Sequence, residues 1–388
     1  MSNLKHEPIK ILRIIARMNL GGPAIQISGL YRGMNKEAFK TILVCGNCEP
    51  NEVDFLIETN SSIPVKRLSE LGRSVSIFND LKALLSLIRI IRKENPHIIH
   101  THTAKAGVLG RLASILSFRR SLRVHTFHGH LLKGYFRGIK LKIILAIEFV
   151  LSLMTHRLIA VGDVVREDLL SVGIGKRDKF LVFQPGVLPP KTYDKFEMRN
   201  EFSIPNDALV ISFVGRIEKI KRPDRFIEVA EKVTIACPDA NLVFLVAGEG
   251  NLLDQTKEAA RLRNLPIRFL GWIPTIEKVL SASDLVLLTS ENEGIPMSLI
   301  QSSFCAIPAV ATNVGSVREV VIDSETGKLC NEDTLELSAS VVELIRDENF
   351  RNRLGQNAKK LAFEKFHVSR LVADHENLYS RLIKNRAN

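Results

Sequence analysis

The sequence predicts an α/β protein with two Rossmann-like, doubly wound domains that face each other across a cleft. Three observations lead to this prediction. The chain has 388 residues, which suits two domains at roughly 150 residues each. Short apolar runs alternate with helical patterns in two long stretches, and a segment rich in proline separates these stretches. Each stretch is long enough to bury a hydrophobic core of its own.

In the first stretch, apolar runs of strand length alternate with longer segments of helical periodicity. The strands are predicted at residues 9–15, 41–45, 98–100, 123–127, 158–161 and 180–183, and the helices at 25–34, 74–92 and 106–116. Within the second of these helices, apolar residues recur every three or four positions. Alternation of this kind predicts a parallel sheet that is covered by helices on both faces.

The pattern breaks and then restarts. Prolines and a glycine gather at Pro185, Gly186, Pro189, Pro190 and Pro205. Beyond them, strands are predicted at 210–214, 242–247, 267–270, 285–289 and 309–311, with helices at 223–235 and 296–304. We therefore expect a first domain at 1–188, a linker at 189–207, a second domain at 208–365, and a C-terminal helix at 366–388 that packs back on the first domain.

Charge is distributed unevenly along the chain. The net charge is +12, and the first 190 residues hold 28 basic and 14 acidic residues, so the whole excess lies in the first half. Such asymmetry predicts an anionic partner: nucleic acid, a phospholipid surface or a phosphorylated substrate. A basic surface without a specific partner is the alternative. Nucleic acid is disfavoured because no basic platform interleaved with aromatic residues is present.

Composition and apolar patterning predict a cytoplasmic protein. No uncharged apolar run of about 18 residues is present, and residues 1–10 lack the apolar core of a signal peptide. The five cysteines are odd in number and show no disulfide framework. Cys45 and Cys48 form one C-x-x-C pair, for which two thiols without a metal or redox role are the favoured interpretation.

One basic and apolar segment raises the hypothesis of peripheral binding at the inner face of the cytoplasmic membrane. An apolar run at 143–153, interrupted only by Glu148 and Ser152, follows the cations Lys133, Arg137, Lys140 and Lys142. Basic residues beside an apolar helix favour an anionic membrane surface. The alternative is an ordinary core helix.

Four short segments contain residues that suit substrate chemistry. Gly21-Gly22-Pro23 lies between the first strand and the first helix, where backbone amides can approach an anion, although such a turn is also common for steric reasons. Arg216 and Lys221 follow a strand of the second domain. Two cations there suit a diphosphate, and a solvated basic loop is the alternative.

Glu293 follows another strand of that domain and can accept hydrogen bonds from sugar hydroxyls. The amides of Gly294 and Ile295, expected at a helix start, can donate to an anion or a hydroxyl. The alternative is that the acid only complements the helix dipole. His125, His128 and His130 invite a metal hypothesis, but no carboxylate accompanies them, so a single functional histidine, His128, is favoured, with a packed loop histidine as the alternative.

Together these segments resemble glycosyltransferase family 4, whose members have the GT-B fold. The resemblance covers nearly the whole chain, and the order and spacing of the motifs carry it rather than any single one. The motifs are GGPA at 21–24, HTHTAKAG at 100–107, HTFHG at 125–129, FVGR at 213–216 with Lys221, AGEG at 247–250, FLGW at 269–272, SD at 283–284, SENEG at 290–294 and PAVATNVG at 308–315.

The resemblance implies a role for each matching residue. Arg216 and Lys221 hold the donor diphosphate, which the backbone of Gly22 approaches. His128 lies near the transferring sugar, and Glu293, the first acid of an E-x7-E element, holds that sugar. Gly294 and Ile295 supply the amides that follow. The second acid, which binds the ribose, is replaced by Gln301, and Ser316 stands where a second glycine is usual.

The activity implied is that of a retaining glycosyltransferase, of the hexosyl or N-acetylhexosaminyl type. It takes a nucleotide-sugar donor and a glycan or lipid-linked acceptor of a surface glycan such as lipopolysaccharide, O-antigen or capsule. No metal cofactor is expected, because Arg216 and Lys221 take the place of a divalent cation. The alternatives are a UDP-sugar 2-epimerase of the same fold, for which the first domain lacks clear acid/base carboxylates, and a non-catalytic nucleotide-sugar-binding protein, favoured only by Gln301.

Overall fold

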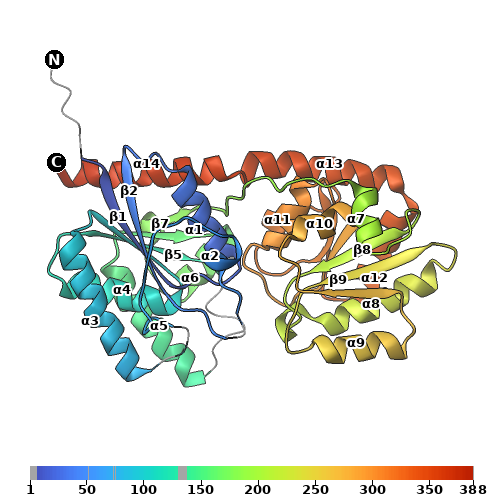
Figure 1. Cartoon of the computed structure of the whole chain (residues 1–388), viewed down its shortest axis with the longest axis horizontal. Coiled ribbons are helices and arrows are strands. Elements are labelled where there is room, and N and C mark those ends of the chain that lie inside the picture. Colours follow the sequence, from blue (N-terminus) through green and yellow to red (C-terminus); the bar gives the residue numbers. More distant parts are fainter. Residues whose placement is uncertain (1–6, 51, 73, 75, 130–137, 388) are drawn as a thin grey trace, which may run out of the picture. The chain divides into compact units, whose positions relative to one another are not determined.

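The computed structural model describes residues 7–50, 52–72, 74, 76–129 and 138–387, which form two compact units. Unit 1 combines Met1–Val187 with Val368–Asn388, and unit 2 is Leu188–His367. Each unit contains one parallel sheet with helices on both faces (Figure 1). The two parallel α/β sheets predicted from the alternating pattern are confirmed.

In unit 1 the sheet has seven strands in the order β3-β2-β1-β4-β5-β6-β7. The strands are β1 (Ile9–Arg17), β2 (Phe39–Gly46), β3 (Val65–Arg67), β4 (Ile98–His102), β5 (Leu122–Phe127), β6 (Arg157–Ala160) and β7 (Phe180–Val182). All neighbouring pairs are parallel. The strand order reverses between β1 and β4, where doubly wound sheets place their ligands outside the carboxyl ends.

The helices of unit 1 connect these strands and include the last helix of the chain. They are α1 (Gly22–Gly33), α2 (Phe55–Glu58), α3 (Ile77–Glu94), α4 (Ala104–Leu116), α5 (Gly138–Leu153), α6 (Asp163–Ser171) and α14 (Val368–Ala387). Small residues on α1 let α14 approach closely. A Cβ added to Gly29 would lie 2.8 Å from Cγ2 of Val368, and one added to Gly33 would lie 2.6 Å from Cγ2 of Val372.

In unit 2 the sheet has six strands in the order β10-β9-β8-β11-β12-β13. The strands are β8 (Leu209–Val214), β9 (Leu242–Ala247), β10 (Ile267–Gly271), β11 (Leu285–Leu288), β12 (Ala309–Thr312) and β13 (Gly327–Cys330). The helices are α7 (Lys195–Glu201), α8 (Pro223–Ala236), α9 (Leu253–Leu262), α10 (Ile276–Ala282), α11 (Met297–Phe304), α12 (Thr334–Arg346) and α13 (Glu348–Lys365). Here the order reverses between β8 and β11.

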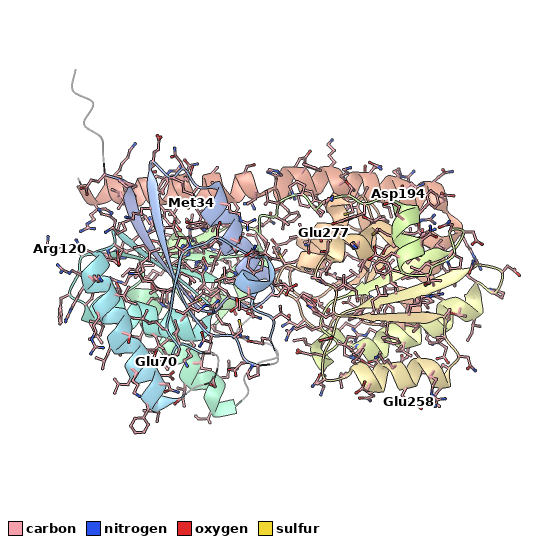
Figure 2. All side chains as sticks on the ribbon, viewed as in Figure 1. Met34, Glu70, Arg120, Asp194, Glu258 and Glu277 are labelled. Carbon is pink, nitrogen blue, oxygen red and sulfur yellow. The ribbon has the colours of Figure 1, made fainter. Side chains whose placement is uncertain are left out.

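Several boundaries differ from those predicted, for local reasons. The first helix begins at Gly22 rather than at residue 25, because Pro23 fits the first turn of a helix. The short strands β3 and β13 were not predicted, since each is an edge strand of three or four residues with a mixed pattern. The segment 189–207 contains α7, whose first turn is capped by the Asp194 carboxylate (Figure 2).

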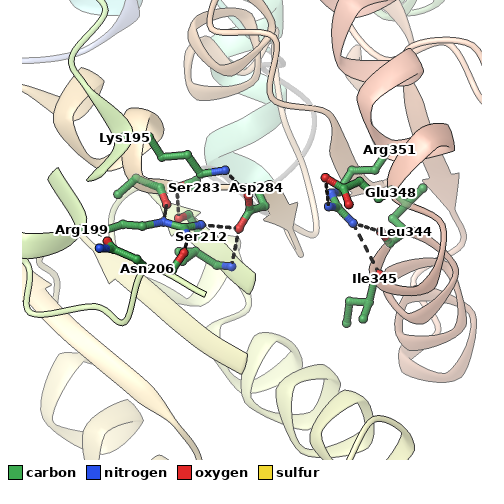
Figure 3. Close-up of polar contacts among 12 residues, drawn as sticks. Lys195, Arg199, Asn206, Ser212, Ser283, Asp284, Leu344, Ile345, Glu348 and Arg351 are labelled. Carbon is green, nitrogen blue, oxygen red and sulfur yellow. Dashed lines mark hydrogen bonds and ion pairs between the residues drawn. The ribbon is translucent and has the colours of Figure 1, made fainter. Parts of the chain in front are cut away.

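A buried acid ties α7 to the centre of the unit 2 sheet (Figure 3). The Asp284 carboxylate accepts hydrogen bonds from the Val210 amide at 2.8 Å, from Arg199 at 2.7 Å and from Lys195 at 2.5 Å. Arg199 also donates to the carbonyl of Asn206 at 2.5 Å. The side chains of Arg199 and Asp284 are both nearly excluded from solvent. Asp284 therefore fixes the start of β8 against α7, which gives the SD motif a structural role.

We expect Asp284→Ala to lower the free energy of unfolding of unit 2 by about 3 kcal/mol, because it leaves the buried Arg199 charge without its partner. The chain has one tryptophan, Trp272, and it lies in unit 2. Urea unfolding followed by tryptophan fluorescence therefore reports this unit. Asp239→Ala, at an exposed acid of the same unit, is the matched control. An equal midpoint in both variants would show that the network contributes nothing.

Candidate functional site

In unit 2, the loops at the carboxyl ends of β8, β11 and β12 are bonded to one another. The Thr289 hydroxyl, just after β11, donates to the Lys221 carbonyl at 3.0 Å. The Thr312 hydroxyl, at the end of β12, donates to the Ser290 carbonyl at 2.7 Å. The segments predicted to bind the donor thus form one structure, because parallel strands end at the same edge of a sheet.

Lys221 and Glu293, both predicted as site residues, form an ion pair in this structure. The distance from Nζ of Lys221 to Oε1 of Glu293 is 2.5 Å, and the Ser290 hydroxyl donates to the same oxygen at 2.6 Å. The Lys221 side chain is 17% exposed and that of Glu293 10%. A lysine has three N–H donors, so Lys221 can donate to Glu293 and to a phosphate at the same time. The pair places one cation and one hydroxyl acceptor side by side.

Arg216 stands apart from this pair. Its guanidinium bonds Glu218 at 2.8 Å, and its side chain is 57% exposed. The structure therefore does not bring Arg216 into contact with Lys221 or Glu293. The residue before it, Gly215, has φ of 155°, a conformation that favours glycine. Arg216 follows Gly215 directly after the end of β8.

The AGEG motif after β9 packs against the backbone of the loop after β8. A Cβ added to Gly248 would lie 1.9 Å from the Gly215 carbonyl oxygen, and one added to Gly250 would lie 2.3 Å from that of Ile217. The Ile217 amide also donates to the Glu249 carbonyl at 2.8 Å. These glycines let two loops touch and so shape the backbone on which Arg216 and Lys221 stand.

Gly294 and Ile295 lie before α11 rather than at its start. The helix begins at Met297 with Pro296 as its N-cap, which corrects the predicted start by one residue. Within the described part of the chain, neither amide donates a hydrogen bond. Both donors therefore remain able to bond a ligand. Gln301 lies within α11 and is partly buried.

Ser316 is fully buried close to Glu293. Its amide donates to the Glu293 carbonyl at 3.3 Å. Its hydroxyl has no hydrogen-bond partner among the described residues. A buried hydroxyl without a partner is costly, so the serine at this position, where the resemblance expects glycine, is not explained by packing.

In unit 1, Gly22 opens α1 at the carboxyl end of β1. The N-cap Gly21 is extended, no side chain caps the helix, and its first turn has no acid. The amides at the positive end of the helix dipole are therefore not neutralised by the chain's own carboxylates in that turn. This geometry suits the predicted approach of the backbone to a phosphate.

His128 follows β5 and contacts a second histidine. Its Nε2 lies 3.0 Å from Nδ1 of His102 at the end of β4. Burial lowers the pKa of His128 to about 4, and burial, followed by the nearby charges, lowers the pKa of His102 well below its usual range. Both rings are therefore neutral near pH 7. The ring of His125 bonds Thr101 instead, and His130 lies outside the described residues.

Sequence reasoning did not find the cluster behind His128. The His102 ring stacks on that of His100 at 4.3 Å, and Nδ1 of His100 lies 2.6 Å from the Tyr379 hydroxyl of α14. The fully buried Arg13 donates to the same nitrogen at 3.2 Å, so Nδ1 accepts and Nε2 carries the hydrogen. His375, also from α14, stacks on His100 at 5.7 Å. The only sequence signal was HTH at a strand end.

The histidine cluster predicts that unit 1 loses stability in mild acid. In the folded chain the pKa is about 4 for His128 and about 3 for His375, against 6.5 for an unperturbed histidine. Between these values the unfolded state binds more protons, so stability is complete above pH 6.5 and falls as the pH drops toward 4. Each such ring contributes up to about 2 kcal/mol between pH 6.5 and 5.

Urea midpoints measured by circular dichroism at pH 7.5 and 5.0 test this expectation. His375→Gln removes one of these rings and should flatten the dependence on pH. A midpoint that is the same at both pH values in the unaltered protein contradicts the burial of neutral histidines.

Two family models match the chain, one in each half. The model for Glycosyltransferase Family 4 matches residues 20–188, and the model for Glycosyl transferases group 1 matches 194–361. Among relatives, the chain is 25% identical over 390 aligned positions to the UDP-Gal:alpha-D-GlcNAc-diphosphoundecaprenol alpha-1,3-galactosyltransferase of Escherichia coli, covering 98% of this chain and 99% of that one. It is 25% identical to the capsular polysaccharide biosynthesis glycosyltransferase CapM of Staphylococcus aureus, covering 83% and 85%.

Solved structures share the fold across the whole chain. HepE of Anabaena, in complex with UDP and glucose, has a TM-score of 0.82 at 19% identity and covers 96% of this chain and 100% of its own. The sucrose-phosphate synthase of Thermosynechococcus elongatus has a TM-score of 0.81 at 18% identity, covering 97% and 100%. These similarities show the GT-B fold. With the two matched models spanning both halves, the chain belongs to glycosyltransferase family 4.

Proposed function

We propose that this glycosyltransferase retains the anomeric configuration and transfers a hexosyl or N-acetylhexosaminyl group from a nucleotide-sugar to a lipid-linked surface glycan. The observation that carries the proposal is the Lys221–Glu293 pair, held by Ser290 beside the unbonded amides of Gly294 and Ile295. These groups lie at the carboxyl ends of the strands and suit a sugar diphosphate. They are one cation, one carboxylate that can accept from hydroxyls, and two backbone N–H donors.

Each group has a distinct task in this proposal. As the bond to the sugar breaks, negative charge develops on the diphosphate. Lys221 and Arg216 stabilise that charge, and preorganised donors of this kind supply a large part of catalysis. Glu293 accepts hydrogen bonds from the sugar hydroxyls, and the amides of Gly294 and Ile295 donate to the sugar or the phosphate. Gln301 offers its carbonyl oxygen to the ribose without a charge.

In unit 1 we assign the donor diphosphate to the α1 start at Gly22 and the transferring sugar to His128. The neutral ring of His128 is held by His102, so it can donate or accept a hydrogen bond without carrying charge. A neutral ring suits a polar contact with a sugar hydroxyl. The ring therefore does not act as a permanent cation in this proposal.

The names of two similar proteins support the substrate classes. The relative from Escherichia coli is named for transfer to a sugar on diphosphoundecaprenol, and another HepE structure is described in complex with UDP-glucose. We therefore propose a polyprenyl-diphosphate-linked acceptor and a UDP-hexose as the first donor to test. We expect activity in the presence of a chelator, with Arg216 and Lys221 in place of a divalent cation.

A lipid-linked acceptor requires contact with a membrane surface. In the described part of the chain, no helix combines the length and apolar character needed to cross a bilayer. We propose peripheral binding to the inner face of the cytoplasmic membrane. Of the cations that suggested this, Lys133 and Arg137 and the side chain of Lys140 lie outside the described residues, while Lys142 is exposed on α5.

Release of nucleoside diphosphate, measured with and without a lipid-linked acceptor, tests the proposal against its alternatives. A transferase releases the nucleotide much faster when the acceptor is present. A UDP-sugar 2-epimerase instead converts the donor to its 2-epimer, which chromatography of the nucleotide sugar detects. A non-catalytic binding protein shifts its melting temperature with donor but never releases nucleotide.

We expect Arg216→Ala and Lys221→Ala each to lower kcat/KM at least tenfold, which corresponds to about 1.4 kcal/mol of lost transition-state stabilisation. Lys219→Ala is the matched control, because Lys219 is an exposed cation of the same loop. It should retain activity. If all three variants turn over like the unaltered enzyme, the loop is only a solvated basic surface.

Glu293 and Gln301 should differ in their effects on steady-state kinetics. Glu293→Gln should lower kcat strongly, because it removes the charged acceptor for the sugar and leaves Lys221 unpaired. Gln301→Glu should change mainly the donor KM. The change should correspond to about 1 to 2 kcal/mol of donor binding free energy, the contribution of one charge-assisted hydrogen bond. If the unaltered chain binds donor without transfer and Gln301→Glu gains turnover, the natural protein is a binding protein.

A further inference from the structure

Helix α5 of unit 1 presents an apolar face to solvent. Its exposed apolar side chains include Ile139, Ile143, Ile147, Val150 and Leu153, spaced three or four residues apart. Phe149 is exposed beside them, and the exposed Met154 directly follows the helix. Ile143 and Val150 are each 53% exposed. In the same layer, α4 packs against both α3 and α5 (Figure 1). Ile77 and Phe78 at the start of α3 are also exposed. Exposed apolar patches of this extent mark interaction surfaces.

The acid of α5 points the other way. At about 100° per residue, Glu148 lies about 180° around the helix from Ile139 and the centre of the exposed face. Its carboxylate is buried and forms two bonds of 2.7 Å with Arg111 of α4. Lys142 is exposed at the edge of the apolar face. The helix thus keeps its negative charge inside and shows solvent an apolar face with a basic rim.

An open cavity of about 500 Å³ lies where α5 ends. Leu153 and Met154 line it, together with four cations from β5, β6, the turn before β7 and α14, namely Arg123, Arg157, Lys179 and Arg386. A smaller cavity of about 240 Å³ shares Arg386 and adds Arg119 and Arg120. Among the described residues, no carboxylate forms an ion pair with any of these cations.

Two of the four cations have a structural role at the end of α5. Arg123 donates to the Met154 carbonyl at 2.6 Å, and Lys179 donates to the Leu153 carbonyl at 2.9 Å. They thereby satisfy the last carbonyls of the helix. Among the residues that the structure describes, the Arg386 side chain forms no hydrogen bond, and the Arg157 guanidinium donates only to the carbonyl of His156. Burial and these four cations lower the pKa of His156 to about 4, so the cavity wall is strongly positive.

We propose that α5 lies in the interface of a lipid bilayer with its apolar face among the acyl chains, and that the cavity at its end binds the phosphate headgroup of an anionic phospholipid. The geometry is that of an interfacial amphipathic helix, whose binding combines buried apolar area with attraction to anionic lipid. The proposal rests on the proposed function in one respect, since a lipid-linked acceptor gives this surface its purpose.

A second copy of the chain fits this surface less well. A twofold dimer through α5 would bring two cation-lined cavities together. It would also bring together the first 190 residues of both copies, and in each copy these hold twice as many basic as acidic residues. Like charges at an interface oppose association. An anionic bilayer supplies both an apolar interior for α5 and a negative surface for the cations.

Flotation with vesicles tests the proposal. The vesicles are made of phosphatidylcholine alone or with phosphatidylglycerol, and the salt is low or about 1 M, at which the Debye length is about 3 Å. Ile143→Ser with Val150→Ser weakens the apolar face. Its control is Ile235→Ser with Leu262→Ser, two apolar residues of unit 2 that are even more exposed. Arg157→Gln with Arg386→Gln removes the cations without a capping role. Its control is Lys359→Gln with Lys360→Gln on α13.

The unaltered protein should float with phosphatidylglycerol vesicles at low salt and lose most of this binding at 1 M. The Ile143/Val150 variant should lose at least tenfold in partitioning to both kinds of vesicle. The Arg157/Arg386 variant should lose at least tenfold for phosphatidylglycerol vesicles, at about fivefold per cation, and little for neutral vesicles. Both controls should float like the unaltered protein.

Three results would overturn the proposal. One is a lack of flotation with phosphatidylglycerol at low salt, or equal flotation by all variants. Another is protection from heat by inorganic phosphate, lost in the Arg157/Arg386 variant, without binding to vesicles, which would assign the cavity to a soluble phosphate. The third is a dimer in light scattering that the Ile143/Val150 variant dissociates, which would assign the face to a second copy.

The test is independent of catalysis. Nucleotide release in detergent with a short-chain acceptor needs no bilayer, so both variants should keep it. If flotation behaves as expected and no nucleotide is ever released, the proposed function fails and the membrane surface remains. If release occurs and flotation does not, the membrane proposal alone fails.

Discussion

The parallel direction of the strands governs where chemistry can occur in each unit. Because every strand of a unit runs the same way, the loops that leave the carboxyl ends share one edge of its sheet. In unit 2 this brings together Lys221, after β8, and Glu293, after β11, which are 72 residues apart in sequence. In unit 1 it brings His102, at the end of β4, beside His128, after β5. The remaining contacts refine positions that this constraint has already set.

Much of the fold and part of the site follow from sequence patterns. Strands such as β8 and β9 are continuous apolar runs, so their positions and their strand-end loops are predictable, and with them the proximity of Lys221 to Glu293. Whether the two side chains form an ion pair is not predictable, because this depends on the Ser290 hydroxyl and on side-chain geometry. The helix start near Gly294 was misplaced because Pro296 caps α11 instead of entering it.

Other features depend on contacts between distant parts of the chain. His100 meets Tyr379 across a sequence separation of 279 residues, and no local pattern links a strand to a helix so far along. The exposure of α5 is likewise invisible in its composition, since an apolar run reads the same in a core and on a surface. Some motifs of the family also change meaning once contacts are known. Asp284 holds α7 to the start of β8, and Gly248 lets two loops touch.

The return of α14 to unit 1 affects the order in which the chain can fold as it is made. Leu371, Leu378 and Tyr379 of that helix belong to the same hydrophobic core as Ile11 of β1 and Ile98 of β4. A ribosome releases β1 before unit 2 and α14 after it, so unit 1 lacks part of its core throughout synthesis of the continuous segment Leu188–His367. Unit 2 can therefore fold completely before unit 1 does, which reverses the usual N-terminal-first sequence of domain folding.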